Sequence, residues 1–183
     1  AFVNDNGELQ LITDREVDVS EASGGANTAG FAGTAETVTE EAAGATARVH
    51  VNIDTGMGRM GLLSDTPVED VRTIAGLPGI EVEGVYSHFP DSDEEDLGAA
   101  RLQLERFCEI IRDIERAGMP VRFRHVANSA AVMVFGPEAA FDLVRPGVSA
   151  YGMYPSTEVA ARMRGVVDLR PCMTVVSALA KVT

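Results

Sequence analysis

The sequence predicts an α/β fold with a parallel sheet or a segment of a barrel. Strand-like and helix-like patterns alternate from residue 49 onward, and strands that are joined through helices run parallel. Polar and charged residues follow each predicted strand, as they do at the rim of a barrel. With 183 residues and 45% hydrophobic content, the chain is long enough for one domain with a core, or for part of a larger domain.

The first part of the chain is poorly patterned. The segment GELQLITD, residues 7–14, is compatible with a strand, whereas residues 23–36 are mostly small and have little to bury. We expect a loop there, followed by a weak helix at about residues 35–43.

The first clear strand covers Val49 to Ile53, where apolar residues alternate with polar ones. A loop with glycines at positions 56, 58 and 61 follows it and contains Arg59. Because glycine tolerates positive φ angles, we expect this loop to bend and to aim Arg59 at a ligand.

A helix is predicted next, with Thr66 as its cap, Pro67 in its first position and Glu69 closing a capping box. It should end at Gly76. A second strand is predicted from about Ile80 to His88, because this segment is rich in β-branched and aromatic residues.

The longest predicted helix covers Leu97 to Ala117 and ends before Gly118 and Pro120. Its apolar side chains recur at helical spacing and form one face: Leu97, Ala100, Leu104, Phe107, Ile111 and Ile114. The remaining predicted elements are a strand at residues 121–127, a short helix at Ala130–Phe135 and a fourth strand at residues 141–148.

The net charge of −13, from 28 acidic and 15 basic residues, argues against binding to nucleic acid or to an anionic membrane surface. No apolar run has the length of a membrane span and no signal peptide is evident, although the chain starts at Ala1, so we expect sequence upstream. Cys108 and Cys172 have neither disulfide-type nor metal-type spacing, which favours reduced core thiols and a cytoplasmic protein.

Four polar clusters follow the four predicted strands: Asp54 to Arg59, then Ser87 with His88, then Asn128 with Ser129, and last Arg145 to Gly147. The rim at the carboxyl ends of barrel strands is where active sites are assembled, and phosphate binds there after the last strands. Ser129 at a strand-to-helix turn, with Gly147 permitting close backbone approach, suits a phosphate. An ordinary serine cap beside a turn glycine is the alternative.

Four ordered motifs resemble the alanine racemase family. They are DTGMGRMG at residues 54–61, YSHF at 86–89, HVANSAA at 125–131 and FDLVRPGVSAYG at 141–152. The resemblance extends from about residue 48 to the end of the chain. The four motifs together are specific, whereas each alone is not.

The resemblance implies an isomerase that interconverts L-alanine and D-alanine with pyridoxal 5'-phosphate as cofactor, and a homodimer whose active sites are shared between subunits. It implies a partial (β/α)8 TIM-type barrel that runs into a C-terminal β domain. On this basis residues 1–47 are a poorly patterned segment, residues 48–165 are the second half of the barrel, and residues 166–183 begin the β domain.

The resemblance also implies roles for individual residues. Ser129 and the backbone of Gly147 and Val148 would hold the cofactor phosphate, and Asn128 would fix that loop. No metal ligand is implied.

Arg145 would face the pyridine nitrogen of the cofactor, with His125 as its partner. An arginine suits this place because it donates a hydrogen bond and scarcely gives up its proton, so the ring nitrogen stays largely unprotonated. A salt bridge at the barrel rim is the alternative for Arg145. Arg59 would reach a substrate carboxylate or the catalytic tyrosine, and His88 would tune the acidity of that tyrosine.

The chain departs from the family at Asn52, where many members have a lysine that is often carbamylated. A neutral amide supplies no negative charge beside Arg59. Either a bound anion replaces that charge or Arg59 is held more loosely.

The two catalytic bases of the family have no match. Lys181 is the only lysine of the chain, and it is not in the cofactor motif; Tyr86, Tyr151 and Tyr154 do not fit the tyrosine motif. We therefore expect the isolated polypeptide to be inactive. A half barrel would also leave two strand edges and an apolar face uncovered, so we expect either a piece of a longer protein or pairing between copies.

Three other functions are compatible with parts of the pattern. A non-catalytic carrier of pyridoxal phosphate would also need a lysine and would usually lack Arg145. A diverged phosphate-binding or interaction domain would bind phosphate without catalysis. A racemase for another amino acid would share these motifs, because side-chain selectivity depends on residues outside them.

Overall fold

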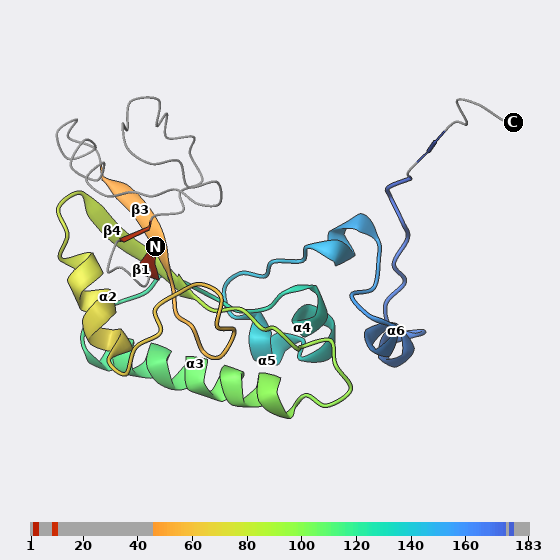
Figure 1. The fold of residues 1–183 in the computed structure, drawn as a ribbon, viewed down its shortest axis with the longest axis horizontal. Helices are drawn as coiled ribbons and strands as arrows, with labels where there is room; N and C mark the ends of the chain where they lie inside the picture. Colours follow the sequence, from red (N-terminus) through yellow and green to blue (C-terminus); the bar gives the residue numbers. More distant parts are fainter. Residues whose placement is uncertain (1, 4–8, 11–45, 175, 178–183) are drawn as a thin grey trace, which may run out of the picture.

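A parallel sheet forms the centre of the structure, a computed structural model that describes residues 2, 3, 9, 10, 46–174, 176 and 177. The sheet contains β3 (Ala47–Asn52), β4 (Ile80–Tyr86) and β5 (Phe123–His125), and each strand pairs with the next along the chain. Sequential parallel pairing through helices is the arrangement of a barrel wall. The parallel sheet predicted from the sequence is confirmed (Figure 1).

Two short strands, β1 (Phe2–Val3) and β2 (Leu9–Gln10), form a separate antiparallel pair. The strand expected within residues 7–14 is therefore present at Leu9–Gln10. The helix expected at residues 35–43 lies outside the described residues.

The two faces of the sheet carry different side chains. Val49 and Val51 of β3 are 1% and 0% exposed and belong to the apolar core. Successive side chains of a strand point to opposite faces, so Asn52 lies on the other face. Across that face Asn52 is in register with Tyr86 of β4, which is in register with His125 of β5. A row of polar and aromatic side chains thus crosses all three strands.

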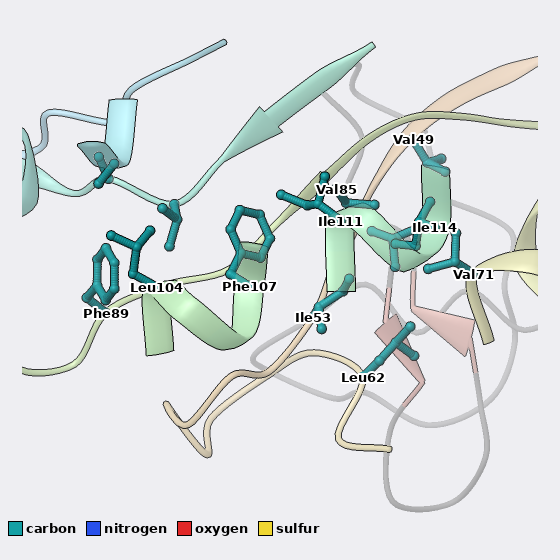
Figure 2. Close-up of a cluster of buried hydrophobic side chains, with 14 of the residues drawn as sticks. Val49, Ile53, Leu62, Val71, Val85, Phe89, Leu104, Phe107, Ile111 and Ile114 are labelled. Atoms are coloured by element: carbon teal, nitrogen blue, oxygen red, sulfur yellow. The ribbon is translucent and has the colours of Figure 1, made fainter. Parts of the chain in front are cut away.

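Two helices supply the rest of the core. α2 (Pro67–Ala75) packs on β4 and against the long helix α3 (Gly98–Arg116), which runs beneath the sheet in Figure 1. The face predicted for the long helix is confirmed, because its apolar residues are buried together with those of the strands, as Figure 2 shows. The buried residues on α3 are Ala100, Gln103, Leu104, Phe107, Ile111 and Ile114.

The start of α2 differs in one detail from the prediction. Pro67 occupies the first turn and Gly76 ends the helix, as expected. However, the Thr66 side chain makes no capping hydrogen bond, so the capping box is wrong. The Thr66 hydroxyl lies 3.2 Å from Ser64 Oγ, and Ser64 Oγ accepts the Thr66 N–H at 3.0 Å, so a local turn replaces the cap.

The chain after β5 forms short helices rather than the predicted fourth strand. These are α4 (Ser129–Val134), α5 (Pro137–Ala140), the 3₁₀ helix η1 (Val148–Tyr151) and α6 (Thr157–Met163). Phe141 has a φ of 45°, which interrupts an extended backbone. The Asp142 carboxylate also accepts the Arg124 N–H at 2.9 Å, so this donor is not used in a regular ladder. Two backbone bonds, from Asp142 to Arg124 and from Arg145 to Ala127, still hold this segment beside β5.

The described residues that follow α6 contain no helix or strand, and the β domain expected from residue 166 stays a prediction. Cys108 on α3 is half-buried, and Cys172 is exposed, so the expectation of a core thiol is wrong for Cys172 because its surroundings form no strand. Both are free thiols. In the described part of the chain, no helix is both long and apolar enough to cross a membrane.

Candidate active site

The loop after β3 is shaped by one carboxylate and several glycines. Asp54 Oδ1 accepts the N–H groups of Gly56 and Met57 at 2.8 and 2.7 Å, and Oδ2 accepts that of Gly58 at 2.8 Å. Gly56, Gly58 and Gly61 have φ angles of 140°, 66° and 116°. Side chains other than glycine rarely adopt such angles, so the glycine pattern is required by the bend that was predicted from it.

Arg59 lies exposed on this loop and lines a small pocket. Asn52, Ser87 and His88 also line the pocket. Asn52 is 5% exposed, and its Nδ2 donates to the Met60 carbonyl at 3.2 Å. The amide of Asn52 therefore anchors the backbone beside Arg59.

Arg145 connects its own segment to the ends of β4 and β5. Its Nη2 donates to the Ser87 carbonyl at 2.6 Å and to the Val126 carbonyl at 3.3 Å, and lies 3.2 Å from His88 Nδ1. Its Nη1 donates to His125 Nδ1. Among the described residues no carboxylate forms an ion pair with Arg145, so the alternative of a rim salt bridge is wrong for this part of the chain. The guanidinium is held by neutral acceptors.

A chain of hydrogen bonds runs from Arg145 across the sheet. Burial, then the charge of Arg145 and the ring of His50, lowers the pKa of His125 to about 3, so this histidine is neutral. Since its Nδ1 accepts from arginine, its proton is on Nε2 and is donated to His50 Nδ1 at 2.7 Å. His50 Nε2 in turn lies 3.8 Å from Glu83 Oε2. His125, the partner predicted for Arg145, is thus in contact with it, and His50 and Glu83 extend the series.

Gly84 and Tyr86 of β4 contact the histidines of this series of hydrogen bonds. A Cβ atom added at Gly84 would lie 2.7 Å from His50 Nδ1, so only glycine leaves room for that ring. The Tyr86 ring stacks on His125 with centroids 4.9 Å apart, and the Arg145 guanidinium carbon lies 5.3 Å from the centre of the same ring. Burial raises the pKa of Tyr86, although Arg145 opposes the shift.

His88 stands between the two arginines of the site. Burial lowers the pKa of His88, and the charges of Arg145 and then Arg59 lower it further. The imidazole is therefore neutral near pH 7. Its Nδ1 accepts from Arg145, which leaves the proton on Nε2.

The predicted phosphate residues come together at the start of α4. Ser129 is 5% exposed, and its hydroxyl accepts the Ser149 N–H at 3.2 Å. A Cβ atom added at Gly147 would lie 3.9 Å from Ser129 Oγ, so glycine keeps the space beside the hydroxyl open. Val148 follows Gly147 as the first residue of η1.

Asn128, and not Ser129, caps α4, so the alternative of a serine cap is wrong. Its Oδ1 accepts the Ala131 N–H at 3.0 Å and the Ser92 hydroxyl at 2.8 Å. Its Nδ2 donates to the Phe89 carbonyl at 3.2 Å. Asn128 thereby ties the start of α4 to the loop after β4.

The first two clusters are joined by Thr55 and Ser87, whose buried hydroxyls lie 2.8 Å apart. The first, second and fourth clusters are thus linked by hydrogen bonds, although no strand of the described residues directly precedes the fourth. The sequence did not indicate His50, Ser92 or Tyr86 as members. Gly84 within a strand was the available signal for His50, because a strand glycine marks the close approach of another group.

Sequential parallel strands with their polar residues gathered at one rim define a partial (β/α)8 barrel with its site at the carboxyl ends of the strands. The chain matches the family profile described as "Alanine racemase, N-terminal domain" over residues 29–155. This match covers most of the chain, and the protein belongs to the alanine racemase family.

Relatives and solved structures agree with this assignment. Alanine racemase from Carboxydothermus hydrogenoformans is 43% identical over 133 residues, which are 73% of this chain and 35% of that protein. Alanine racemase from Desulforamulus reducens is 44% identical over 132 residues, 72% of this chain and 35% of that protein. The chain thus spans about a third of the length of these relatives.

Among solved structures, alanine racemase from Clostridium difficile in complex with cycloserine superposes with a TM-score of 0.68 and 31% identity, over 74% of this chain and 36% of that one. Alanine racemase from Streptomyces coelicolor gives a TM-score of 0.65 and 37% identity, over 74% of this chain and 36% of that one.

Proposed function

We propose that this chain supplies the cofactor-binding and carboxylate-binding rim of an alanine racemase, which uses pyridoxal 5'-phosphate to interconvert L-alanine and D-alanine. The observation that carries the proposal is the setting of Arg145. A half-buried guanidinium, oriented by two carbonyl groups and two neutral histidines, is arranged to donate a hydrogen bond and not to neutralise an acid.

The residues at the start of α4 fit the cofactor phosphate. The Ser129 hydroxyl and the open space at Gly147 provide a donor and close backbone approach, and the backbone of Val148 lies next to them. Asn128 holds this turn in place through its cap and its bond to Ser92. Ser129 and the backbone of Gly147 and Val148 would hold the phosphate, and Asn128 would fix their loop.

When bound, pyridoxal phosphate withdraws electrons from the substrate and so lowers the barrier to removing the Cα proton. Arg145 would donate to the ring nitrogen without protonating it, because a guanidinium retains its proton at neutral pH even where burial lowers its pKa. His125 fixes the direction of Arg145, since its Nδ1 accepts from Nη1. This side chain pair would keep the electron withdrawal moderate and favour proton exchange.

Arg59 would bind the substrate carboxylate, for which a planar guanidinium is well suited. Its glycine loop and the Asn52 contact set its position. His88 would donate from Nε2 to the phenol of the catalytic tyrosine and so stabilise the phenolate form. The active protein would be a cytoplasmic homodimer with a site shared between subunits.

The proposal is tested by measuring D-alanine formed from L-alanine by the protein expressed from its own gene, with pyridoxal phosphate present. We expect Arg145→Gln to lower kcat about 10²-fold or more, because the group facing the cofactor ring is lost. Arg116→Gln is the matched control, since Arg116 forms only an exposed pair with Asp113. Absence of D-alanine with the wild-type protein, or full activity of Arg145→Gln, would contradict the proposal.

A further inference from the structure

One buried polar side chain of the described residues has no hydrogen-bond partner. Gln103 on α3 is 6% exposed, and neither its Nε2 nor its Oε1 is paired within that part of the chain. Buried amides are nearly always hydrogen-bonded, so an unpaired one calls for an explanation. A side chain of the same length without polar atoms would avoid the cost.

Gln103 lies against the loop that carries Arg59. A Cβ atom added at Gly56 would lie 3.0 Å from Gln103 Nε2 and 3.4 Å from its Cδ and Cγ atoms. The amide therefore occupies the space that a side chain at position 56 would need. Gly56 also has a φ of 140°, so this contact falls on the most unusual backbone of the loop.

A second side chain of α3 already holds the same loop. Arg106 Nη1 donates to the Thr55 carbonyl at 3.3 Å. Residues three positions apart share one face of a helix, so Gln103 and Arg106 reach the loop side by side. The Gly56 N–H donates to Asp54 Oδ1, and the Gln103 amide lies beside the same residue.

We propose that Gln103 is a positioning residue for Arg59, which donates from Nε2 to the Gly56 carbonyl when a carboxylate is bound at Arg59. Glycine permits the peptide rotation that this bond requires. Binding of the carboxylate and closure of the loop onto α3 are then coupled. The proposal rests on the carboxylate-binding role of Arg59 in the proposed function.

Gln103→Met is the informative variant, because it keeps the length of the side chain and removes the amide. In the protein expressed from its own gene, we expect KM for alanine to rise about three- to tenfold with kcat nearly unchanged, as for the loss of one hydrogen bond in binding. The melting temperature should stay equal or rise, because no unpaired amide remains. Leu102→Met is the control, since Leu102 is 61% exposed on the same helix.

Hydrogen exchange gives a readout that does not depend on activity. Acetate, as a simple carboxylate, should slow amide exchange at residues 56–58 in the wild-type protein and not in Gln103→Met. An unchanged KM together with unchanged exchange would overturn the inference, as would a lower melting temperature with no change in KM. If the wild-type protein forms no D-alanine, the proposed function fails, and the exchange comparison alone still decides the role of Gln103.

Discussion

At the scale of single residues, His125 shows how burial fixes a protonation state. The ring is 7% exposed, stacks on Tyr86 and accepts a hydrogen bond from Arg145. A protonated His125 would place its charge against the guanidinium, where burial limits screening by solvent. The neutral form is thus imposed by the same contacts that orient Arg145.

This setting predicts a pH dependence of stability. The pKa of His125 falls from 6.5 to about 3 on folding, so between these values the unfolded chain binds a proton that the folded chain does not. The contribution of His125 to stability is therefore complete above pH 6.5 and is lost as the pH falls towards about 3. Other groups also titrate in this range, so the change in stability with pH must be compared between the wild-type protein and a variant without His125.

The free energy of unfolding of the wild-type protein and of His125→Gln should be measured by urea denaturation at pH 7.5 and pH 4.5. We expect the wild-type protein to lose more stability on acidification than His125→Gln does. Equal losses would show that His125 titrates normally in the folded state.

Several residue contacts were predictable and others were not. Ser129 and Gly147 were paired from the sequence because both were predicted at strand ends, and strand ends of a barrel share one rim. The contacts of His50 and Tyr86 depend on which strand residues are in register, and side-chain alternation alone does not give the register between strands.

At the scale of elements, the loop after β3 combines two kinds of glycine. A Cβ atom at Gly61 would lie 3.0 Å from Asn52 Cγ and from Asp54 N, at a φ of 116°. At Gly58 the φ is 66° and the surrounding space is open within 4 Å. The first position therefore excludes a side chain by contact and by angle, whereas the second requires only the left-handed backbone.

We expect Gly61→Ala to destabilise the protein by about 1–3 kcal/mol and to impair the position of Arg59. Gly58→Asn is the matched control, because asparagine tolerates left-handed angles, and it should change stability by less than about 1 kcal/mol. Thermal unfolding of the two variants provides the comparison. Equal effects would mean that the loop does not have the packed shape described above.

The elements that were predicted well have strong patterns of their own. The apolar face and the end of the long helix α3 follow from the residues of the helix itself. The same holds for the strand β4, whose β-branched and aromatic residues predict it. The segment at residues 141–148 has apolar residues typical of a strand, but tertiary contacts override them. The carboxylate of Asp142 occupies a donor of β5, and Phe141 bends the backbone. The pattern of apolar residues cannot predict that a side-chain carboxylate will take a backbone N–H of a neighbouring strand.

At the scale of the whole molecule, the core and the candidate site lie in different parts of the fold. The buried apolar side chains of α2, α3 and the sheet form one core (Figure 2). The site is built from side chains beyond the ends of the strands, which lie far apart in the sequence. Thr55 contacts Ser87, and Ser129 contacts Ser149. Arg145 contacts His88 and His125. The function proposed for the chain depends on this convergence and not on any single motif.

The central claim is that these strand ends bind pyridoxal phosphate, and cofactor binding tests it most directly. The protein expressed from its own gene, freed of cofactor, should be titrated with pyridoxal phosphate and followed by absorbance. We predict saturable binding that Ser129→Ala weakens about tenfold or more, through the loss of a hydrogen bond to a charged group, and that Ser64→Ala leaves unchanged. No binding by the wild-type protein, or equal binding by Ser129→Ala, would contradict the claim.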